Sequence, residues 1–417
     1  MLQRPVRRTV IAGAALTIVL ILAGSLGGGS GRAGEAPQSR ADAYREAAAL
    51  TDLGRRLFSD PILSASGKLS CASCHVPEHG FTPANASPVQ LGGLDLKQPG
   101  TRAVPALTYL QATPQFTEHF FDNEEEGDES VDNGPTGGLT WDGRADRPRE
   151  QARIPLLAAN EMANASAAAV VARIAGSAYA KELRAIAGAD VFADPDRAFT
   201  AILTALETFQ EDAATFYPYS SKYDAYLAGK AKLTDQEARG LALFNDEKKG
   251  NCASCHISQV RGDGTPPQFT DYGMIALGVP RNPAIPANAD PRYFDLGLCG
   301  PLRRDLLGKA EYCGLFKTPS LRNVALRQTF FHNGVFHSLR QAVEFYASRD
   351  TNPEKWYPRR ADGTVAAYDD LPKDYWDNLN MDPPFGGKPG DKPALNAAEI
   401  DDVVAFLKTL TDGWRPQ

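Results

Sequence analysis

The sequence predicts an all-α fold of two tandem helical units that carry long irregular loops. Three features occur twice along its 417 residues: the pentapeptide Cys-Ala-Ser-Cys-His, an amphipathic segment before it, and a segment with an apolar stripe near the end of each half. Several features repeated in the same order indicate a duplicated architecture. The length fits about two domains, and we expect them to span residues 40–225 and 226–417.

The duplicated pentapeptide indicates the chemistry of each unit. The C-x-x-C-H pattern is typical of c-type haem attachment, in which both thiols form thioethers with the porphyrin and the histidine binds the iron. Four of the six cysteines belong to the two copies, which are Cys71-Ala-Ser-Cys74-His75 and Cys252-Ala-Ser-Cys255-His256. The sequence therefore predicts two cytochrome c-like domains, each with one covalently bound haem c. The alternative is a C-x-x-C disulfide beside an unrelated histidine.

Helices are expected before each pentapeptide, at 50–60 and 233–246, and at the end of each unit. The closing segments place apolar residues at helical spacing on one face. These residues are Phe199, Ile202, Leu203, Leu206 and Phe209 in the first unit, and Ile400, Val403, Val404, Leu407 and Leu410 in the second. Proline and glycine in 80–105 and 264–301 predict irregular loops, which would wrap a porphyrin in place of a larger apolar core.

Residues 1–36 have the pattern of an export signal. Three arginines between positions 4 and 8 precede an apolar run from Thr9 to Leu26, and small residues follow. This order is typical of a secretory signal peptide. The apolar run is close to the ~20 residues that cross a bilayer, so an uncleaved membrane anchor is the alternative to the favoured cleavage. In both cases we expect the rest of the chain in the periplasm.

The two remaining cysteines, Cys299 and Cys313, lie outside the haem motifs. An oxidising compartment permits a disulfide between them, and closing so short a loop would stabilise the fold by about 3 kcal/mol. The alternative is a pair of buried free thiols.

The remaining axial position of each iron distinguishes an electron carrier from an enzyme. For the second haem we expect Tyr346 as ligand. Ser338 and Gln341 predict a capping box that starts a helix, and Leu339, Val343 and Tyr346 then share one apolar face. From composition alone, a core tyrosine with a hydrogen-bonded hydroxyl is the alternative.

The first haem has no clear distal ligand in the sequence. His79 follows His75 too closely to reach the opposite face of the same porphyrin, and His119 is a minor alternative. The distal position of the first iron thus has no assigned ligand, and an iron left open at that position can bind peroxide or O2.

Three motifs extend the pattern beyond the haem sites. Trp141-Asp-Gly-Arg144 is followed by Gln151 ten residues after the tryptophan and by Glu161 ten residues after that; the second unit carries the segment 316–323, Phe-Lys-Thr-Pro-Ser-Leu-Arg-Asn, and His332-Asn-Gly. With these motifs the chain, from about 45 to 412, resembles the bacterial di-haem cytochrome c peroxidase family, most closely its MauG branch.

The resemblance implies roles for these residues. Trp141 resembles the residue that carries charge between the two haems, and Gln151 and Glu161 resemble the distal-pocket pair of the peroxide-reactive haem. Tyr346 stands fourteen residues after the His-x-Gly histidine, where peroxidases carry an axial methionine and MauG-like enzymes a tyrosine. The family also holds a calcium ion between its domains through an asparagine. Ala103 occupies that position here, so calcium would depend on carbonyls and water.

The function implied is that of a periplasmic di-haem oxidoreductase that uses hydrogen peroxide to form high-valent haem and oxidises a tryptophan or tyrosine of an exported partner protein. The alternative is a cytochrome c peroxidase that reduces hydrogen peroxide with electrons from a small redox protein. A plain electron carrier is disfavoured because the first haem lacks a second ligand. The net charge of −7 argues against nucleic acid. A possible docking or hopping surface is the aromatic segment with Trp356, Tyr357, Tyr368, Tyr375 and Trp376; the alternative is that these rings anchor a loop.

Overall fold

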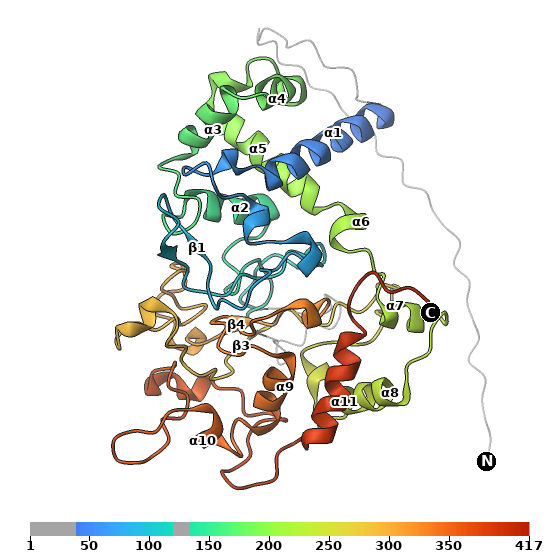
Figure 1. Cartoon of the computed structure of the whole chain (residues 1–417), viewed down its shortest axis with the longest axis vertical. Helices are drawn as coiled ribbons and strands as arrows, with labels where there is room; N and C mark the ends of the chain where they lie inside the picture. The colour runs from blue at the N-terminus through green and yellow to red at the C-terminus, as the bar shows by residue number, and fades with distance from the viewer. Residues whose placement is uncertain (1–38, 120–133, 417) are drawn as a thin grey trace, which may run out of the picture. The chain divides into compact units, whose positions relative to one another are not determined.

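Two pairs of crossed helices, one in each half of the chain, organise the fold (Figure 1). The computed structural model describes residues 39–119 and 134–416, so the expected signal segment lies outside the described residues. In the first half, α1 (Arg40–Ser59) crosses α5 (Pro195–Gln210); in the second half, α8 (Asp235–Asn245) packs on α11 (Ala397–Lys408). The helices expected before each motif and at the end of each half are confirmed.

The same glycine contact closes both crossings. A Cβ atom added to Gly54 would overlap the backbone oxygen of Ala205, and one added to Gly240 would overlap the backbone oxygen of Asp402. Only a residue without a side chain allows two backbones to approach this closely. The fold duplication therefore extends to the atomic details of the helix contact.

A phenylalanine one turn after each glycine continues the correspondence. Phe58 meets Phe209 of α5 edge-on with ring centres 5.4 Å apart, and Phe244 meets Phe406 of α11 edge-on at 5.2 Å. All four rings are buried. Edge-to-face pairs of this kind add about 0.5–1.5 kcal/mol beyond the burial of their surface.

The other helices are short and unevenly distributed. The first half adds α2 (Pro148–Leu157), α3 (Ala167–Ala175), α4 (Tyr179–Ala187) and α6 (Ala213–Phe216); the second adds α7 (Lys222–Leu227), α9 (Leu339–Ser348) and α10 (Pro353–Trp356). The long loops also contain two antiparallel pairs of two-residue strands. These are β1 (Leu91–Gly92) with β2 (Gln98–Pro99), and β3 (Met274–Ile275) with β4 (Phe316–Lys317). The expectation of wholly irregular loops was wrong at these points.

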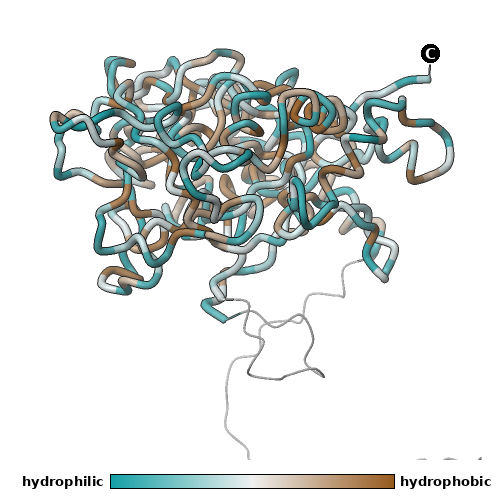
Figure 2. Tube along the Cα trace, turned by 90° about the horizontal axis from the view of Figure 1, so that it is seen from below, coloured by the Kyte–Doolittle hydropathy of each residue, from teal (hydrophilic) through white to brown (hydrophobic). Residues whose placement is uncertain are grey.

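The buried apolar residues form two large clusters and one small one. One large cluster runs from Leu53 to Phe216, the other from Tyr223 to Leu410, and the small one surrounds Cys299 and Cys313. Residues 44–417 nevertheless form one compact unit, and the division at 225 and 226 stays a prediction. Hydrophobic stretches of the trace are short and alternate with hydrophilic ones (Figure 2). Within the described ranges, no helix has the length and apolar character needed to cross a membrane.

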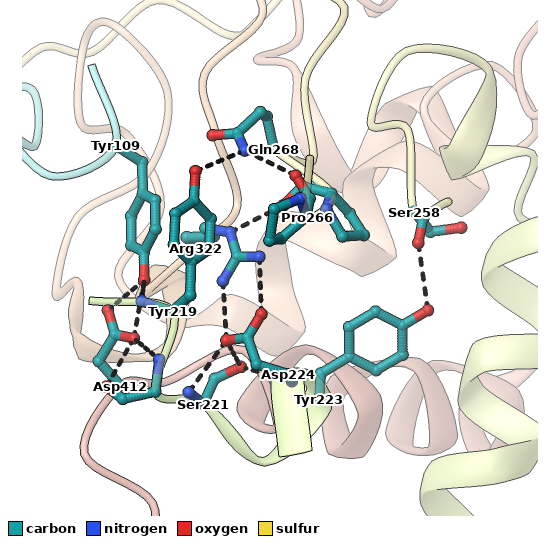
Figure 3. A network of polar contacts seen from close by, with 12 residues as sticks. Tyr109, Tyr219, Ser221, Tyr223, Asp224, Ser258, Pro266, Gln268, Arg322 and Asp412 are labelled. Atoms are coloured by element: carbon teal, nitrogen blue, oxygen red, sulfur yellow. Dashed lines mark hydrogen bonds and ion pairs between the residues drawn. The ribbon is translucent and has the colours of Figure 1, made fainter. Parts of the chain in front are cut away.

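A buried polar network connects residues that are far apart in the sequence (Figure 3). Arg322 donates to both carboxylate oxygens of Asp224 at 2.9 and 3.0 Å. Its guanidinium lies 4.6 and 4.7 Å from the ring centres of Tyr109 and Tyr219, and the Tyr109 hydroxyl donates to Asp412 at 2.8 Å. Removing one partner of such a buried pair leaves an uncompensated charge, which typically costs 3–5 kcal/mol. The network therefore fixes the position of residue 109 against the C-terminal segment.

At the two crossing glycines, substitution by alanine is expected to lower stability, which is the opposite of its usual effect in a helix. Alanine normally stabilises a helix interior by about 1 kcal/mol relative to glycine, but Gly54→Ala and Gly240→Ala should each destabilise the protein by about 1–3 kcal/mol because the helices must separate. Thermal unfolding followed by circular dichroism measures this. Gly262→Ala is the control, since a Cβ at that position meets no atom, and its unfolding temperature should be unchanged. An unchanged or raised unfolding temperature in the Gly240 variant would show that the crossing tolerates a side chain.

Candidate functional site

The second pentapeptide lies in the wall of a cavity of about 250 Å³. Cys252, Cys255, His256 and Tyr346 line this cavity, together with apolar residues of α9 and α11. Trp141 and Gln151, from the first half of the chain, line it as well. The structure therefore brings together predicted residues that are more than a hundred positions apart in the sequence.

The cysteines of both pentapeptides are half-buried and form no disulfide. Each motif begins with a 3₁₀ turn, Cys71–Ser73 and Cys252–Ser254, and all four thiols are free. Burial raises the pKa of the Cys71 and Cys252 thiols to about 12. Redox-active C-x-x-C pairs have a lowered thiol pKa, so these motifs lack the environment of a thiol–disulfide site.

Both motif histidines are held in the same way. The Nδ1 atom of His75 lies 3.0 Å from the carbonyl oxygen of Phe81, and that of His256 lies 2.9 Å from the carbonyl oxygen of Phe269. A carbonyl acceptor places the proton on Nδ1 and leaves the Nε2 lone pair for a metal. Burial lowers the pKa of His75 to about 4, so its imidazole is neutral, as a metal ligand must be.

The two acceptor residues adopt a strained backbone conformation. Phe81 and Phe269 have φ angles of 56° and 53°, in the left-handed region that a residue with a Cβ enters at a cost of about 1–3 kcal/mol. Both side chains are buried, which holds the turn in place. The sequence analysis did not identify these residues, because they follow their histidines by 6 and 13 positions and neither is a glycine.

Helix α9 places Tyr346 in the cavity wall. Leu339, Val343 and Tyr346 line the cavity from one face of the helix, which is the expected face. Only one of the two hydrogen bonds of the predicted capping box is present. Ser338 accepts from the Gln341 N–H at 3.1 Å, but the Gln341 side chain accepts from the His337 N–H at 3.3 Å instead of returning to Ser338. Burial raises the pKa of the Tyr346 phenol.

Glu161 lies in the turn after α2, close to the first motif. Burial raises the pKa of its carboxyl, and its charge in turn contributes to the raised pKa of the Cys74 thiol, after burial. The loop at Leu91–Gly93 fixes the backbone of this turn: the Gly93 N–H donates to the Glu161 carbonyl at 2.7 Å, and a Cβ at Gly92 would overlap the backbone of residue 160. The carboxyl is therefore held beside the first pair of cysteines by a loop that contains no histidine.

Trp141 is clamped at both its side chain and its backbone. Its indole N–H donates to the Ala103 carbonyl at 2.7 Å, and its carbonyl accepts from the Lys317 N–H at 2.8 Å. The next residue, Asp142, is fully buried and accepts from Arg102 and Arg144, each at 2.7 Å. The indole is thus held rigidly between segments from both halves of the chain.

Two cationic side chains in the cavity wall indicate that the cavity suits haem. Lys317 and Arg327 line the cavity, and burial lowers their pKa values to about 8 and about 10. Neither forms an ion pair with a carboxylate of the described residues. An enclosed charge needs a partner, and the propionates of a haem would provide one. Together with thiols, neutral imidazoles and apolar walls, these cations fit haem; the sequence analysis did not identify them.

The oxygen atoms available beside Ala103 do not favour a calcium site. The methyl side chain offers no oxygen, and its carbonyl already accepts the Trp141 indole N–H. In the part of the chain that the structure describes, no group of three or more His, Cys, Asp or Glu side chains could hold a metal ion. Calcium prefers six to eight oxygen ligands, and the residues at this position do not fit that requirement.

The other predicted residues lie away from the cavity. Cys299 and Cys313 form a disulfide with an S–S distance of 2.01 Å, inside the small apolar cluster. His119 is exposed and is not among the residues that line the cavity. Its position gives no support for a role as a haem ligand.

Comparisons with known proteins show the family that the chain resembles. The sequence profile of the di-haem cytochrome c peroxidase family matches residues 48–232. Methylamine utilization protein MauG of Paracoccus denitrificans is 35% identical over 375 residues, which cover 87% of this chain and 89% of that protein. Cytochrome c551 peroxidase of Nitrosomonas europaea is 28% identical and covers 88% and 81%. The crystal structure of the diheme peroxidase BthA from Burkholderia thailandensis superposes with a TM-score of 0.77 at 40% identity, covering 87% of this chain and 86% of that one.

The enclosed cations predict separate effects on the two haem potentials. Arg327 contributes, after burial, to the lowered pKa of His75, whereas Lys317 interacts with Asp271, which interacts with His256. Because a nearby cation disfavours ferric iron, Arg327→Met should lower the midpoint potential of the first haem and Lys317→Met that of the second. We expect a tenfold shift of the ferric–ferrous equilibrium, or about 59 mV.

Spectroelectrochemical titration of the holoprotein measures both potentials. Lys97→Met, at an exposed position, is the control and should leave them unchanged. Arg327→Lys and Lys317→Arg should restore most of the shift. Equal potentials in wild type and both methionine variants would show that neither cation faces a haem carboxylate.

Proposed function

The chain belongs to the di-haem cytochrome c peroxidase family and is a peroxidase-type oxidoreductase; within this family we propose that it is a MauG-like enzyme, which uses hydrogen peroxide to oxidise a tryptophan or tyrosine of a partner protein. Two covalently bound haem c groups are the cofactors of the family. When bound, haem supplies an iron that reacts with peroxide and exchanges single electrons. The observation that carries the proposal is Tyr346 in the wall of the cavity at the second pentapeptide.

The two pentapeptides are the proposed attachment sites. Cys71 and Cys74 would hold one haem above His75, and Cys252 and Cys255 would hold the other above His256. The Nδ1 bonds to Phe81 and Phe269 support this assignment, because they orient each imidazole and raise its basicity as a ligand.

Tyr346 would complete the coordination of the second iron. A phenolate is anionic and favours a higher charge on the metal, whereas a methionine thioether raises the reduction potential and suits an electron acceptor. Burial raises the pKa of this phenol, so its ionised form depends on a positive partner such as the iron. A tyrosine ligand would therefore favour storage of oxidising equivalents over rapid uptake of electrons.

Glu161 is the proposed acid–base group of the first site. Its carboxylate would accept a proton from hydrogen peroxide and return it to the departing oxygen as water forms. Burial raises the pKa of this carboxyl, which brings it closer to the operating pH, where a group can both accept and donate a proton efficiently. Gln151, from α2, would orient the peroxide if its side chain also reaches the first site; in the structure it lines the cavity at the second pentapeptide.

Trp141 would carry charge between the two sites. It lines the cavity of the second site, and its indole and backbone are both fixed by hydrogen bonds. An oxidising equivalent could thus leave the first site and be used at a distance, by a protein too large to reach the first iron. The partner would meet the enzyme in the periplasm: residues 1–36 have the pattern of a signal peptide, and the Cys299–Cys313 disulfide suits an oxidising compartment.

A second candidate is a peroxidase that reduces hydrogen peroxide with electrons from a small redox protein. It is favoured by the 40% identity to the diheme peroxidase BthA and by the match to a cytochrome c551 peroxidase. The two candidates share the peroxide step and differ in the source of electrons.

Steady-state turnover separates the two candidates. If the enzyme is MauG-like, hydrogen peroxide should be consumed slowly with a reduced small cytochrome c as donor, because Tyr346 disfavours electron uptake by the second site. Tyr346→Met should then increase the rate with this donor at least tenfold. A wild-type turnover as fast as that of the methionine variant would support the peroxidase instead.

Glu161→Gln should lower the rate of reaction with hydrogen peroxide by about 10²–10⁴-fold. Because burial raises the pKa of Glu161, the wild-type rate should fall as the pH decreases through a value above that of an ordinary glutamate, about 4.3, as the base becomes protonated. This limb should be absent in the glutamine variant. Stopped-flow absorbance across pH 4–8 measures the rate and this limb.

The control is Glu78→Gln, which changes an exposed carboxylate near the same motif and should keep both the rate and the pH profile. A Glu161 variant that also kept them would rule out Glu161 as the base.

A further inference from the structure

A continuous series of side chains leads away from Tyr346. The Tyr346 and Phe385 ring centres lie 5.5 Å apart. The guanidinium of Arg349 lies 3.9 Å from the centre of the Phe385 ring and 5.4 Å from the centre of the Tyr368 ring. Each member is therefore in contact with the next, and Tyr368 is connected to the second site through packed side chains.

The series ends at the protein surface. Tyr368 meets Trp376 edge-on with ring centres 5.4 Å apart, and both rings are partly exposed. Two other aromatic residues that were expected at this surface are not exposed. Trp356 and Tyr357 are buried, and Trp356 packs on Phe345, so these two rings anchor the loop in the core.

Tyr368 has a proton acceptor within hydrogen-bond distance. Its hydroxyl donates to Asp350 Oδ1 at 2.7 Å. Arg349 holds that carboxylate through two bonds of 2.8 Å, and the Gly386 N–H donates to it at 2.9 Å. Burial alone would raise the pKa of Asp350, but the bonds and charge of Arg349 outweigh this effect and lower it. Asp350 is therefore ionised and can accept a proton.

We propose that Tyr368, with Asp350 as its proton acceptor, relays single electrons from Trp376 at the surface to the site of Tyr346, and that the partner protein is oxidised at Trp376. This inference rests on the proposed function, because hydrogen peroxide supplies the oxidising equivalents. A tyrosine gives up an electron readily only when its proton can leave at the same time. Among the neighbouring aromatic residues, Tyr357 donates its hydroxyl to the Gly278 carbonyl at 2.6 Å, and a carbonyl cannot take the proton.

The electrons and protons balance in each turnover. Tyr368 loses one electron towards the site of Tyr346 while its phenolic proton moves to Asp350. An electron from Trp376 then restores Tyr368, the proton returns from Asp350, and the partner protein reduces Trp376. Two such electrons, with two protons from solvent, reduce one hydrogen peroxide to two molecules of water. The partner thereby loses two electrons.

The test compares Tyr368→Phe with the matched variant Tyr357→Phe. Both changes remove one hydroxyl from neighbouring rings, whose centres are 5.5 Å apart, but only the first removes a donor to a carboxylate. The holoenzyme is mixed with hydrogen peroxide without any donor, frozen rapidly and examined by electron paramagnetic resonance, with deuterated tyrosine to identify the signal. The wild type and Tyr357→Phe should show a tyrosyl radical, and Tyr368→Phe should show at least tenfold less.

A second measurement uses reduced small cytochrome c as a protein donor. Tyr368→Phe and Trp376→Phe should each slow its oxidation at least tenfold, while the initial reaction with peroxide keeps its rate. Trp376→Phe should retain the tyrosyl radical, so it also tests the relay if Tyr368→Phe fails to fold. Unchanged radical yield and donor oxidation in the folded variants would overturn the relay and leave the proposed function intact. A wild type that does not react with peroxide would overturn both.

Discussion

Two cations that line the cavity without forming an ion pair are the constraint on which the rest of this structure depends. Lys317 and Arg327 line the cavity and are half-buried, and neither forms an ion pair with a carboxylate of the described residues, although burying an unpaired charge is costly. The Arg327 guanidinium donates to the carbonyls of Thr329 and Val104. The imidazoles of His75 and His256 also indicate a bound group. Each is neutral and has its Nδ1 atom already bonded, which leaves Nε2 for a metal. The chain is built around groups that it does not itself supply, and the helix crossings, the strained turns and the long loops are arranged to enclose them.

The sequence predicted what is repeated and local, and it failed where contacts are formed at long range. The paired motifs and the apolar stripes of α5 and α11 have fixed spacing, so their helices could be placed in advance. The crossing glycines lie within the segments that were expected to be helical, but their contact partners, Ala205 and Asp402, lie more than 150 residues away. No spacing rule connects such positions. The pair of Tyr368 and Asp350 was missed for the same reason: eighteen residues separate them, and the loop between them has no period.

The two halves share a scaffold and differ in the groups placed around it. Both use a glycine crossing, a phenylalanine one turn later and a histidine bonded to a left-handed phenylalanine. Around the first motif stands Glu161, fixed by a glycine loop; around the second stands Tyr346, carried by a capped helix. Because the scaffold is common to both, the chemical difference between the sites must come from these added side chains. Burial raises the pKa of both groups, and of the two only Tyr346 is proposed to contact an iron.

The segment around Trp141 is held by a set of charged side chains. Two arginines and two aspartates form a buried set of opposite charges next to the indole: Arg102 bonds both Asp142 and Asp295, and Arg144 bonds Asp142. The disulfide loop adds Arg303, whose guanidinium donates to the Asp142 carbonyl at 2.9 Å. Removing Arg102 would leave the buried carboxylate of Asp295 without its ion-pair partner, at a cost of about 3–5 kcal/mol, so the set resists rearrangement. We expect an indole fixed by hydrogen bonds in such a frame to reorganise little when it gains or loses charge. The rigidity that stabilises this segment is therefore also the property that the proposed transfer of single electrons through Trp141 would require.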